Sequence, residues 1–247
     1  MTVRSDVHYE FATAENGKLV DILRPAAGGE KLPTALLWHG ITPDERHLLR
    51  PLAEAVAALG LLVLVPDWRS DEPDGGRAHL LGSLEFARTR AAALGGDPER
   101  MVVAGWSAGA PAALGLALRP EVTGGWRPAA VVGIASRYDL PARTTGVAPL
   151  TDLAGQGPGL PLPVPVSLVH GTADPLMDVA CSRRLRDALS VGRWPASLEE
   201  VDADHAGPVM AAYDPATDRC LPSTDPRVLA AGALTARAIA RAAGVAV

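Results

Sequence analysis

The sequence predicts an α/β protein in which helices cover both faces of a mostly parallel sheet. Beyond Gly29, short runs of Val, Leu, Ile and Ala alternate with longer helical stretches, and such runs are typical of strands buried on both sides. The 247 residues are 48% hydrophobic and 21% charged, which is enough for one substantial core. We therefore expect a single domain over residues 1–247.

The elements follow in order along the chain. A hairpin is expected within residues 1–30, because the stretches 7–12 and 18–23 flank a turn at Asn16-Gly17. Further strands are expected at residues 34–38, 61–66, 101–104, 129–134, 164–169 and 198–201, and helices at residues 45–59, 78–94, 108–118, 179–189 and 225–243. Residues 138–163, rich in Pro, Gly and Thr, interrupt the alternation and form a candidate minimal lid.

The composition argues against several classes of function. The net charge of −5 shows no long single-sign run, so no nucleic-acid partner is expected. No stretch approaches the roughly 18 uninterrupted apolar residues that span a bilayer, and the N-terminus lacks the apolar run of a signal peptide. We expect a cytoplasmic protein with no membrane partner, while a homodimer stays an open alternative. Cys181 and Cys220 have no metal-like spacing, so neither a metal nor another cofactor is expected.

The strongest chemical signal is Gly105-Trp106-Ser107-Ala108-Gly109, between an apolar strand and a helix rich in Ala and Leu. The two glycines allow strand and helix to approach closely around a tight turn, so that Ser107 stands exposed at the helix N-terminus. Backbone N–H groups at that end can stabilise a developing negative charge. The pattern predicts a nucleophilic serine.

A serine hydroxyl needs a neighbouring base to take its proton. Only two histidines follow Ser107, and His205 lies just beyond the last strand before the C-terminal helix, where a loop could hold it over the serine. Asp174 lies four residues past a buried strand and is our candidate for the acid that orients His205. His170, at that strand end, is interpreted as structural. Two other acidic residues lie near these candidates: Asp178 is interpreted as a helix cap and Asp204 as a loop acid.

An oxyanion hole needs one N–H from the residue after the nucleophile and another from the loop after an earlier strand. Ala108 is the first candidate. Ile41, directly after His39-Gly40, is the second, and Gly40 would keep the backbone open to a substrate oxygen.

Taken together, His39-Gly40, Gly105-x-Ser107-x-Gly109, the segment from His170 to Asp174, and Asp204-His205 resemble the α/β-hydrolase superfamily. The chain is similar to carboxylesterases and dienelactone-hydrolase-like serine hydrolases with little or no cap. The resemblance implies an eight-stranded, mostly parallel sheet and a hydrolase that cleaves a small ester or related acyl bond through an acyl-enzyme on Ser107. Serine stands where dienelactone hydrolases proper carry cysteine, and His-Gly-Ile replaces the His-Gly-Gly-Gly of one lipase and esterase group.

The substrate is less well determined. Trp38, Trp68 and Trp106 fall at or just beyond strand ends, where ligands bind in open α/β sheets, so they are candidates to line the pocket, with core packing as the alternative. An amidase, formamidase or peptidase could use the same three residues. A non-catalytic binding protein of the same fold would usually lack one of them.

Overall fold

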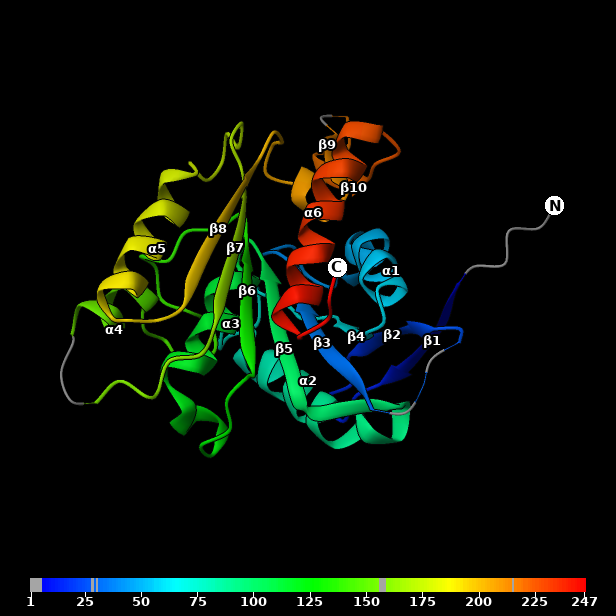
Figure 1. Ribbon diagram of the computed structural model, residues 1–247, viewed down its shortest axis with the longest axis horizontal. Helices are drawn as coiled ribbons and strands as arrows, with labels where there is room; N and C mark the ends of the chain where they lie inside the picture. The colour runs from blue at the N-terminus through cyan, green and yellow to red at the C-terminus, as the bar shows by residue number, and fades with distance from the viewer. Residues whose placement is uncertain (1–5, 28, 30, 156–158, 215) are drawn as a thin grey trace.

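The computed structural model describes residues 6–27, 29, 31–155, 159–214 and 216–247. Residues 1–5, 28 and 30 of the expected hairpin segment, and 156–158 of the expected lid loop, lie outside this description. Eight strands form one sheet in the order β1-β2-β4-β3-β5-β6-β7-β8 (Figure 1). β1 and β2 pair antiparallel, as do β2 and β4, and every other neighbouring pair is parallel. The eight-stranded, mostly parallel sheet confirms the fold class predicted from the sequence.

The strands of this sheet are β1 (Val7–Thr13), β2 (Leu19–Pro25), β3 (Leu32–Trp38), β4 (Leu62–Pro66), β5 (Gly96–Trp106), β6 (Ala130–Ile134), β7 (Val166–Gly171) and β8 (Ala196–Val201). The α-helices are α1 (Arg50–Ala58), α2 (Arg77–Arg90), α3 (Gly109–Leu118), α4 (Pro149–Ala154), α5 (Ala180–Val191) and α6 (Pro226–Ala242). No helix within the described residues is both long and apolar enough to cross a bilayer.

Side-chain alternation along the strands divides the core into two layers. On β3, Leu36 and Trp38 belong to the same apolar layer as buried side chains of α2, α3 and α5, whereas Ala35 and Leu37 belong to the layer that contains buried side chains of α1 and α6. A strand presents successive side chains to opposite faces, so an unbroken apolar run fills both layers at once. The sheet is therefore covered on both faces, as Figure 1 shows.

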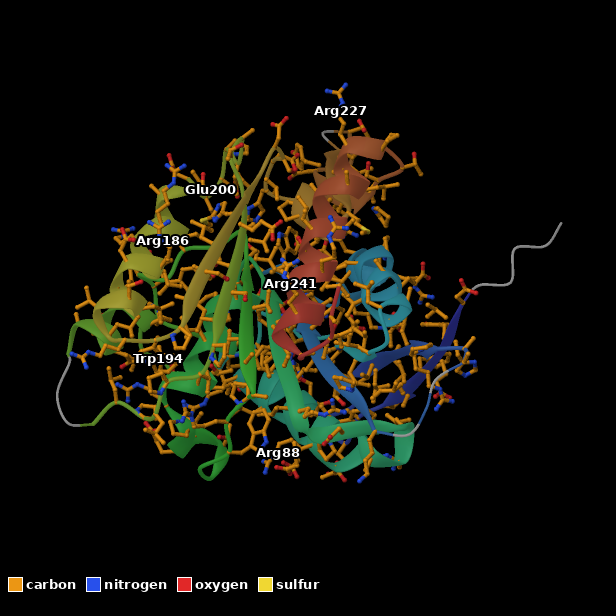
Figure 2. The ribbon with its side chains drawn as sticks, in the orientation of Figure 1. Arg88, Arg186, Trp194, Glu200, Arg227 and Arg241 are labelled. Atoms are coloured by element: carbon orange, nitrogen blue, oxygen red, sulfur yellow. The ribbon has the colours of Figure 1, made fainter. Side chains whose placement is uncertain are left out.

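The edge strand β8 is charged on both faces. Glu199 forms an ion pair with Arg241 of α6, and Glu200 forms one with Arg183 of α5 on the opposite face. Figure 2 labels Glu200 on β8 and Arg241 on α6. Charged side chains of this kind limit strand pairing with other molecules.

A short hairpin and a short α-helix were not predicted. A short hairpin, β9 (Ala211–Asp214) and β10 (Arg219–Pro222), forms a separate two-stranded sheet between the His205 loop and α6. Its strands of four residues are too short to give a clear periodic signal. The six-residue helix α4 lies within the segment expected to be a loop. It begins at Pro149, and proline is well tolerated in the first turn of a helix.

Candidate active site

Ser107 lies in a tight turn between β5 and α3. Its φ of 51° is in the left-handed region, which a non-glycine residue adopts only when its surroundings impose it. A Cβ on Gly105 would lie 2.2 Å from the backbone of Gly109, and a Cβ on Gly109 would lie 2.7 Å from the carbonyl oxygens of Trp38 and His39. The two glycines thus allow the close approach that the turn requires. The Ser107 side chain is half-buried, and its hydroxyl has no hydrogen-bond partner among the described residues.

Asp174 and His205 meet although 31 positions separate them. Asp174 Oδ2 and His205 Nδ1 are 2.7 Å apart, and both side chains are largely buried. This contact assigns the proton of the neutral imidazole to Nδ1 and leaves Nε2 as the free acceptor. Asp178 and Asp204 have other partners: Asp178 accepts from Ala180 N, and Asp204 accepts from the N–H groups of residues 206 and 207.

The Asp174 carboxylate is held on both of its oxygens. Oδ1 accepts hydrogen bonds from the N–H groups of Leu176 and Met177, both at 2.9 Å, and Oδ2 lies 3.2 Å from His170 Nε2. Burial by itself would raise the pKa of Asp174. The hydrogen bonds from His170 and His205 outweigh that effect and hold the pKa well below its usual range. The carboxylate therefore stays ionised at neutral pH.

His170 is buried and anchors this loop from beneath. Its Nδ1 is 2.7 Å from Ser182 Oγ, and its Nε2 is 2.7 Å from the carbonyl oxygen of Met177. Since a carbonyl only accepts, Nε2 carries the proton and Nδ1 accepts from the Ser182 hydroxyl. The structural role that the sequence suggested for His170 has this geometric basis.

The His205 loop is fixed by neighbours from two strands. The Trp106 indole N–H donates to the carbonyl oxygen of His205 at 2.9 Å, and the two rings lie 5.3 Å apart. A Cβ on Gly171, at the end of β7, would lie 2.3 Å from the carbonyl oxygen of Ala203, so this loop packs directly on that strand end.

Two backbone N–H groups are available beside Ser107. No described residue accepts a hydrogen bond from the N–H of Ile41 or of Ala108. Both residues line a pocket of about 170 Å³ together with Ser107; the other lining residues are Pro111, Ser136, Arg137, Leu140, Pro141, Arg143 and Met177. A strand-end N–H and a helix-start N–H in one pocket with a serine suit an oxyanion hole.

The Ile41 loop is shaped by a buried histidine. His39 Nε2 accepts from the N–H groups of Trp68 at 3.2 Å and of Glu45 at 3.4 Å, and Nδ1 lies 3.0 Å from the carbonyl oxygen of Gly40. Burial lowers the pKa of His39 to about 3. The neutral ring therefore ties the loop after β3 to the loop after β4.

The expectation that three tryptophans line the substrate pocket is wrong for Trp38 and Trp68. Both are 0% exposed, and their indole N–H groups donate inside the protein, to Ser83 Oγ and to the carbonyl oxygen of His39. Trp106 is 4% exposed and supports the His205 loop instead of lining the pocket. The prediction that the three tryptophans lie at or just beyond strand ends is correct. The direction of each side chain, however, decides which part of the structure the ring contacts.

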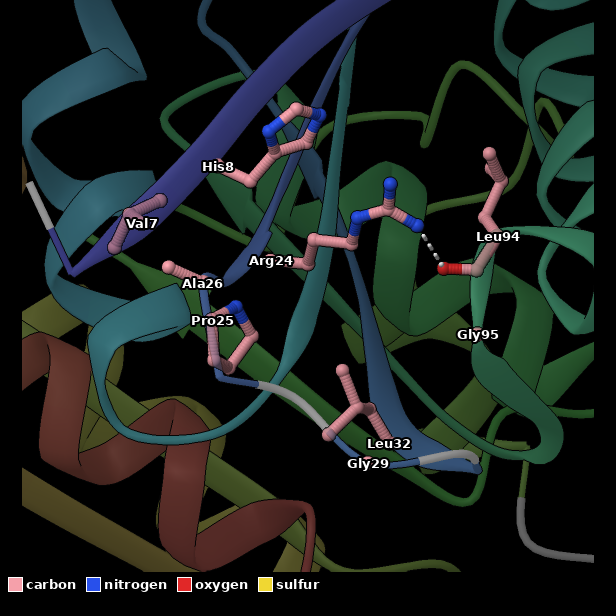
Figure 3. A pocket seen from close by; sticks show the side chains of 9 residues that line it. All are labelled: Val7, His8, Arg24, Pro25, Ala26, Gly29, Leu32, Leu94 and Gly95. Carbon is pink, nitrogen blue, oxygen red and sulfur yellow. Dashed lines mark hydrogen bonds between the residues drawn. The ribbon is translucent and has the colours of Figure 1, made fainter.

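A larger pocket, of about 470 Å³, lies near the N-terminal ends of β3 and β5 (Figure 3). Arg24 donates to the carbonyl oxygen of Leu94 across it. It contains neither Ser107 nor His205, since these lie at the C-terminal ends of the parallel strands. No three His, Cys, Asp or Glu side chains group as metal ligands in the part of the chain that is described.

Comparison with known proteins decides the fold. No protein-family model matches the sequence, and no match was found among curated proteins. Esterase 2 of Thermogutta terrifontis, phosphorylated by paraoxon, has a TM-score of 0.64 to this chain at 21% identity, covering 81% of this chain and 84% of that chain. The esterase Est22 has a TM-score of 0.70 at 17% identity, covering 98% and 82%. The chain has the α/β-hydrolase fold.

Within this α/β-hydrolase fold, sequence analysis missed several residues that surround Ser107. Met177 and Pro111 line the pocket, and Ser136 donates to the carbonyl oxygen of Ser107 at 2.8 Å. Ser136 follows β6 by two residues, so its place at the C-terminal edge of the sheet was a signal that could have been used. Arg137 and Arg143 come from the segment after β6, and no local sequence pattern indicated that they would line the pocket.

Proposed function

We propose that this chain is a serine esterase that cleaves small esters through an acyl-enzyme on Ser107. The observation that carries the proposal is the Asp174–His205 hydrogen bond of 2.7 Å at the edge of the sheet that also presents Ser107 in its constrained turn. In this proposal His205 is the base, Asp174 its orienting acid, and the N–H groups of Ile41 and Ala108 form the oxyanion hole.

The proposed reaction has two steps. Ser107 Oγ attacks the ester carbonyl carbon and gives its proton to His205 Nε2, while the carbonyl oxygen gains negative charge in the oxyanion hole. His205 returns the proton to the departing alcohol oxygen, which leaves Ser107 acylated. Water then attacks the acyl-enzyme with His205 as base, and the acid is released. Asp174 stays ionised throughout and stabilises the protonated imidazole.

The similar structures support this proposal. Esterase 2 of Thermogutta terrifontis is phosphorylated by paraoxon and has also been solved with propionate and with butyrate. Paraoxon is an electrophile that nucleophilic serines attack, and the two acids are products of short-chain ester cleavage. We therefore propose that this chain also cleaves esters of small acyl groups.

Active-site labelling tests the nucleophile. A fluorophosphonate probe should modify the wild-type chain on the peptide that contains Ser107, and Ser107→Ala should lose both the label and ester hydrolysis by several orders of magnitude. Ser136→Ala is the matched control, since Ser136 lines the same pocket and should not take the label. A label mapped to another serine would refute the assignment.

The leaving group is tested with a substrate panel. Nitrophenyl esters and nitroanilides of the same acyl group separate an esterase from an amidase, formamidase or peptidase. We expect the esters to be cleaved faster, because 4-nitrophenolate is a much better leaving group than the anion of 4-nitroaniline. A chain that takes the probe but cleaves neither substrate would favour a role other than hydrolysis.

A further inference from the structure

The pocket beside Ser107 carries two arginines and no acidic residue. Among its ten lining residues, Arg137 and Arg143 are the charged ones, and both follow β6. Most of the remaining lining side chains are apolar, which matches an ester but does not explain the cations. The two arginines differ in what neutralises them.

Arg137 is neutralised inside the protein. Its Nε and Nη2 each lie 2.8 Å from one oxygen of Asp139, which is a bidentate ion pair. This pairing holds the pKa of the Asp139 carboxyl at about 2, through the hydrogen bonds from Arg137 and despite the opposing effect of burial. Arg137 therefore adds little net charge to the pocket.

Arg143 has no carboxylate partner among the described residues. Its Nη1 donates to the carbonyl oxygens of Ser70, at 3.3 Å, and Gly75, at 2.8 Å, and its guanidinium lies 5.7 Å from the centre of the Trp68 ring. No described residue accepts a hydrogen bond from its Nε or Nη2. One nitrogen thus fixes the side chain, and the other two remain available.

The acids of the neighbouring loop are already engaged. Asp71 and Glu72 pair with Arg69, and Asp74 accepts from the N–H groups of Gly76 and Ala78 at the start of α2. None of these carboxylates forms an ion pair or hydrogen bond with Arg143. Of the two arginines that line the pocket, Arg143 is therefore the one without a carboxylate partner among the described residues.

We propose that Arg143 binds a carboxylate group of the substrate, so that the preferred substrates are esters carrying one negative charge. The guanidinium has a planar fork of donors that matches a carboxylate, and here it is held in place by carbonyls that leave its charge unneutralised. One guanidinium without a carboxylate partner suits a single carboxylate. This inference rests on the proposed esterase function and adds the substrate class to it.

The test compares substrates of equal size with and without the charge. The acyl-side pair is 4-nitrophenyl hydrogen glutarate against 4-nitrophenyl pentanoate, and the alcohol-side pair is 4-acetoxybenzoate against 4-acetoxybenzamide. We expect kcat/KM for the anionic member of at least one pair to exceed its match by about tenfold to a hundredfold, the range for a hydrogen bond to a charged group. The pair that responds identifies the side of the ester that Arg143 contacts.

Arg143→Gln should bring that ratio close to one, and Arg143→Lys should restore part of it. The control is the double variant R137Q/D139N, which removes the neighbouring ion pair without changing net charge and should keep the wild-type ratio. Because these ratios compare two substrates on one enzyme preparation, partial loss of folded protein does not change them. If Arg143→Gln fails to fold, wild-type protein still decides: the ratio should fall as salt rises from about 0.01 M to 1 M, where the Debye length shrinks from about 30 to 3 Å.

Each result has one meaning. Equal rates for both members of both pairs would overturn the inference and leave the esterase proposal standing. A preference that survives in Arg143→Gln, or that ignores salt, would assign it to another group and also overturn the inference. No hydrolysis of any ester, with Ser107 unlabelled by the fluorophosphonate, would instead refute the proposed function itself.

Discussion

The buried His39 makes the stability of this protein depend on pH. Its Nε2 accepts two backbone hydrogen bonds, from Trp68 and Glu45, and a proton on that nitrogen would break both. Burial lowers the pKa of His39 from 6.5 to about 3. Above pH 6.5 the ring is neutral in both the folded and the unfolded chain. Below pH 6.5, His39 binds a proton in the unfolded chain but stays neutral in the folded chain. The free energy of unfolding therefore falls as the pH is lowered toward about 3.

The size of this effect follows from the shift. One pKa unit corresponds to about 1.4 kcal/mol, so lowering the pH from 6.5 to 5 should remove about 2 kcal/mol of unfolding free energy through His39. That interval lies above the ordinary carboxylate range, which keeps most acids out of the measurement.

The perturbation is His39→Gln, whose amide oxygen can accept hydrogen bonds but does not titrate. Urea unfolding at several pH values between 7 and 5 should show a shallower loss of stability than in the wild type, by about 2 kcal/mol over the interval. The constant offset caused by the substitution cancels, since only the slopes are compared. His47→Gln, at an exposed position, is the matched control and should keep the wild-type slope. Identical slopes for His39→Gln and the wild type would refute the reasoning.

Three further predictions concern the site. Asp174→Asn should lower kcat by roughly 10³–10⁴-fold by analogy with serine proteases, whereas Asp204→Asn, which keeps its accepting oxygen, should be far milder in the same steady-state assay; the reverse order would exchange the two roles. Along a series of nitrophenyl esters, kcat/KM should peak between acetyl and butyryl, because each methylene beyond the pocket of about 170 Å³ forgoes about 0.8 kcal/mol of burial, and a peak at ten or more carbons would show that the site is not shallow. His170→Ala should lower the free energy of unfolding in urea by about 1–3 kcal/mol, since it leaves the buried Ser182 hydroxyl and the Met177 carbonyl without their partner, and an unchanged midpoint would contradict that anchoring role.

Local patterns in the sequence were enough for the architecture. Continuous apolar runs predicted β3 to β7, because strands buried on both faces need apolar side chains at every position. The spacing of Gly105 and Gly109 around Ser107 predicted the turn, since the close approach it needs is a property of five consecutive residues. Asp174 and His205 could be singled out because the C-terminal ends of parallel strands gather at one edge of a sheet.

The distribution of contacts within that edge was decided by the tertiary structure. A sequence does not show that Trp38 and Trp68 turn inward, because the same strand-end position can face the core or the solvent. It also does not show that Arg137 has a carboxylate partner while Arg143, six residues later, has none. That difference depends on which acidic side chains the fold places beside each arginine and on which of them pair with other residues, as Asp71 does with Arg69. Strands and turns follow from neighbouring residues, whereas the charge of a pocket depends on partners brought together from distant parts of the chain.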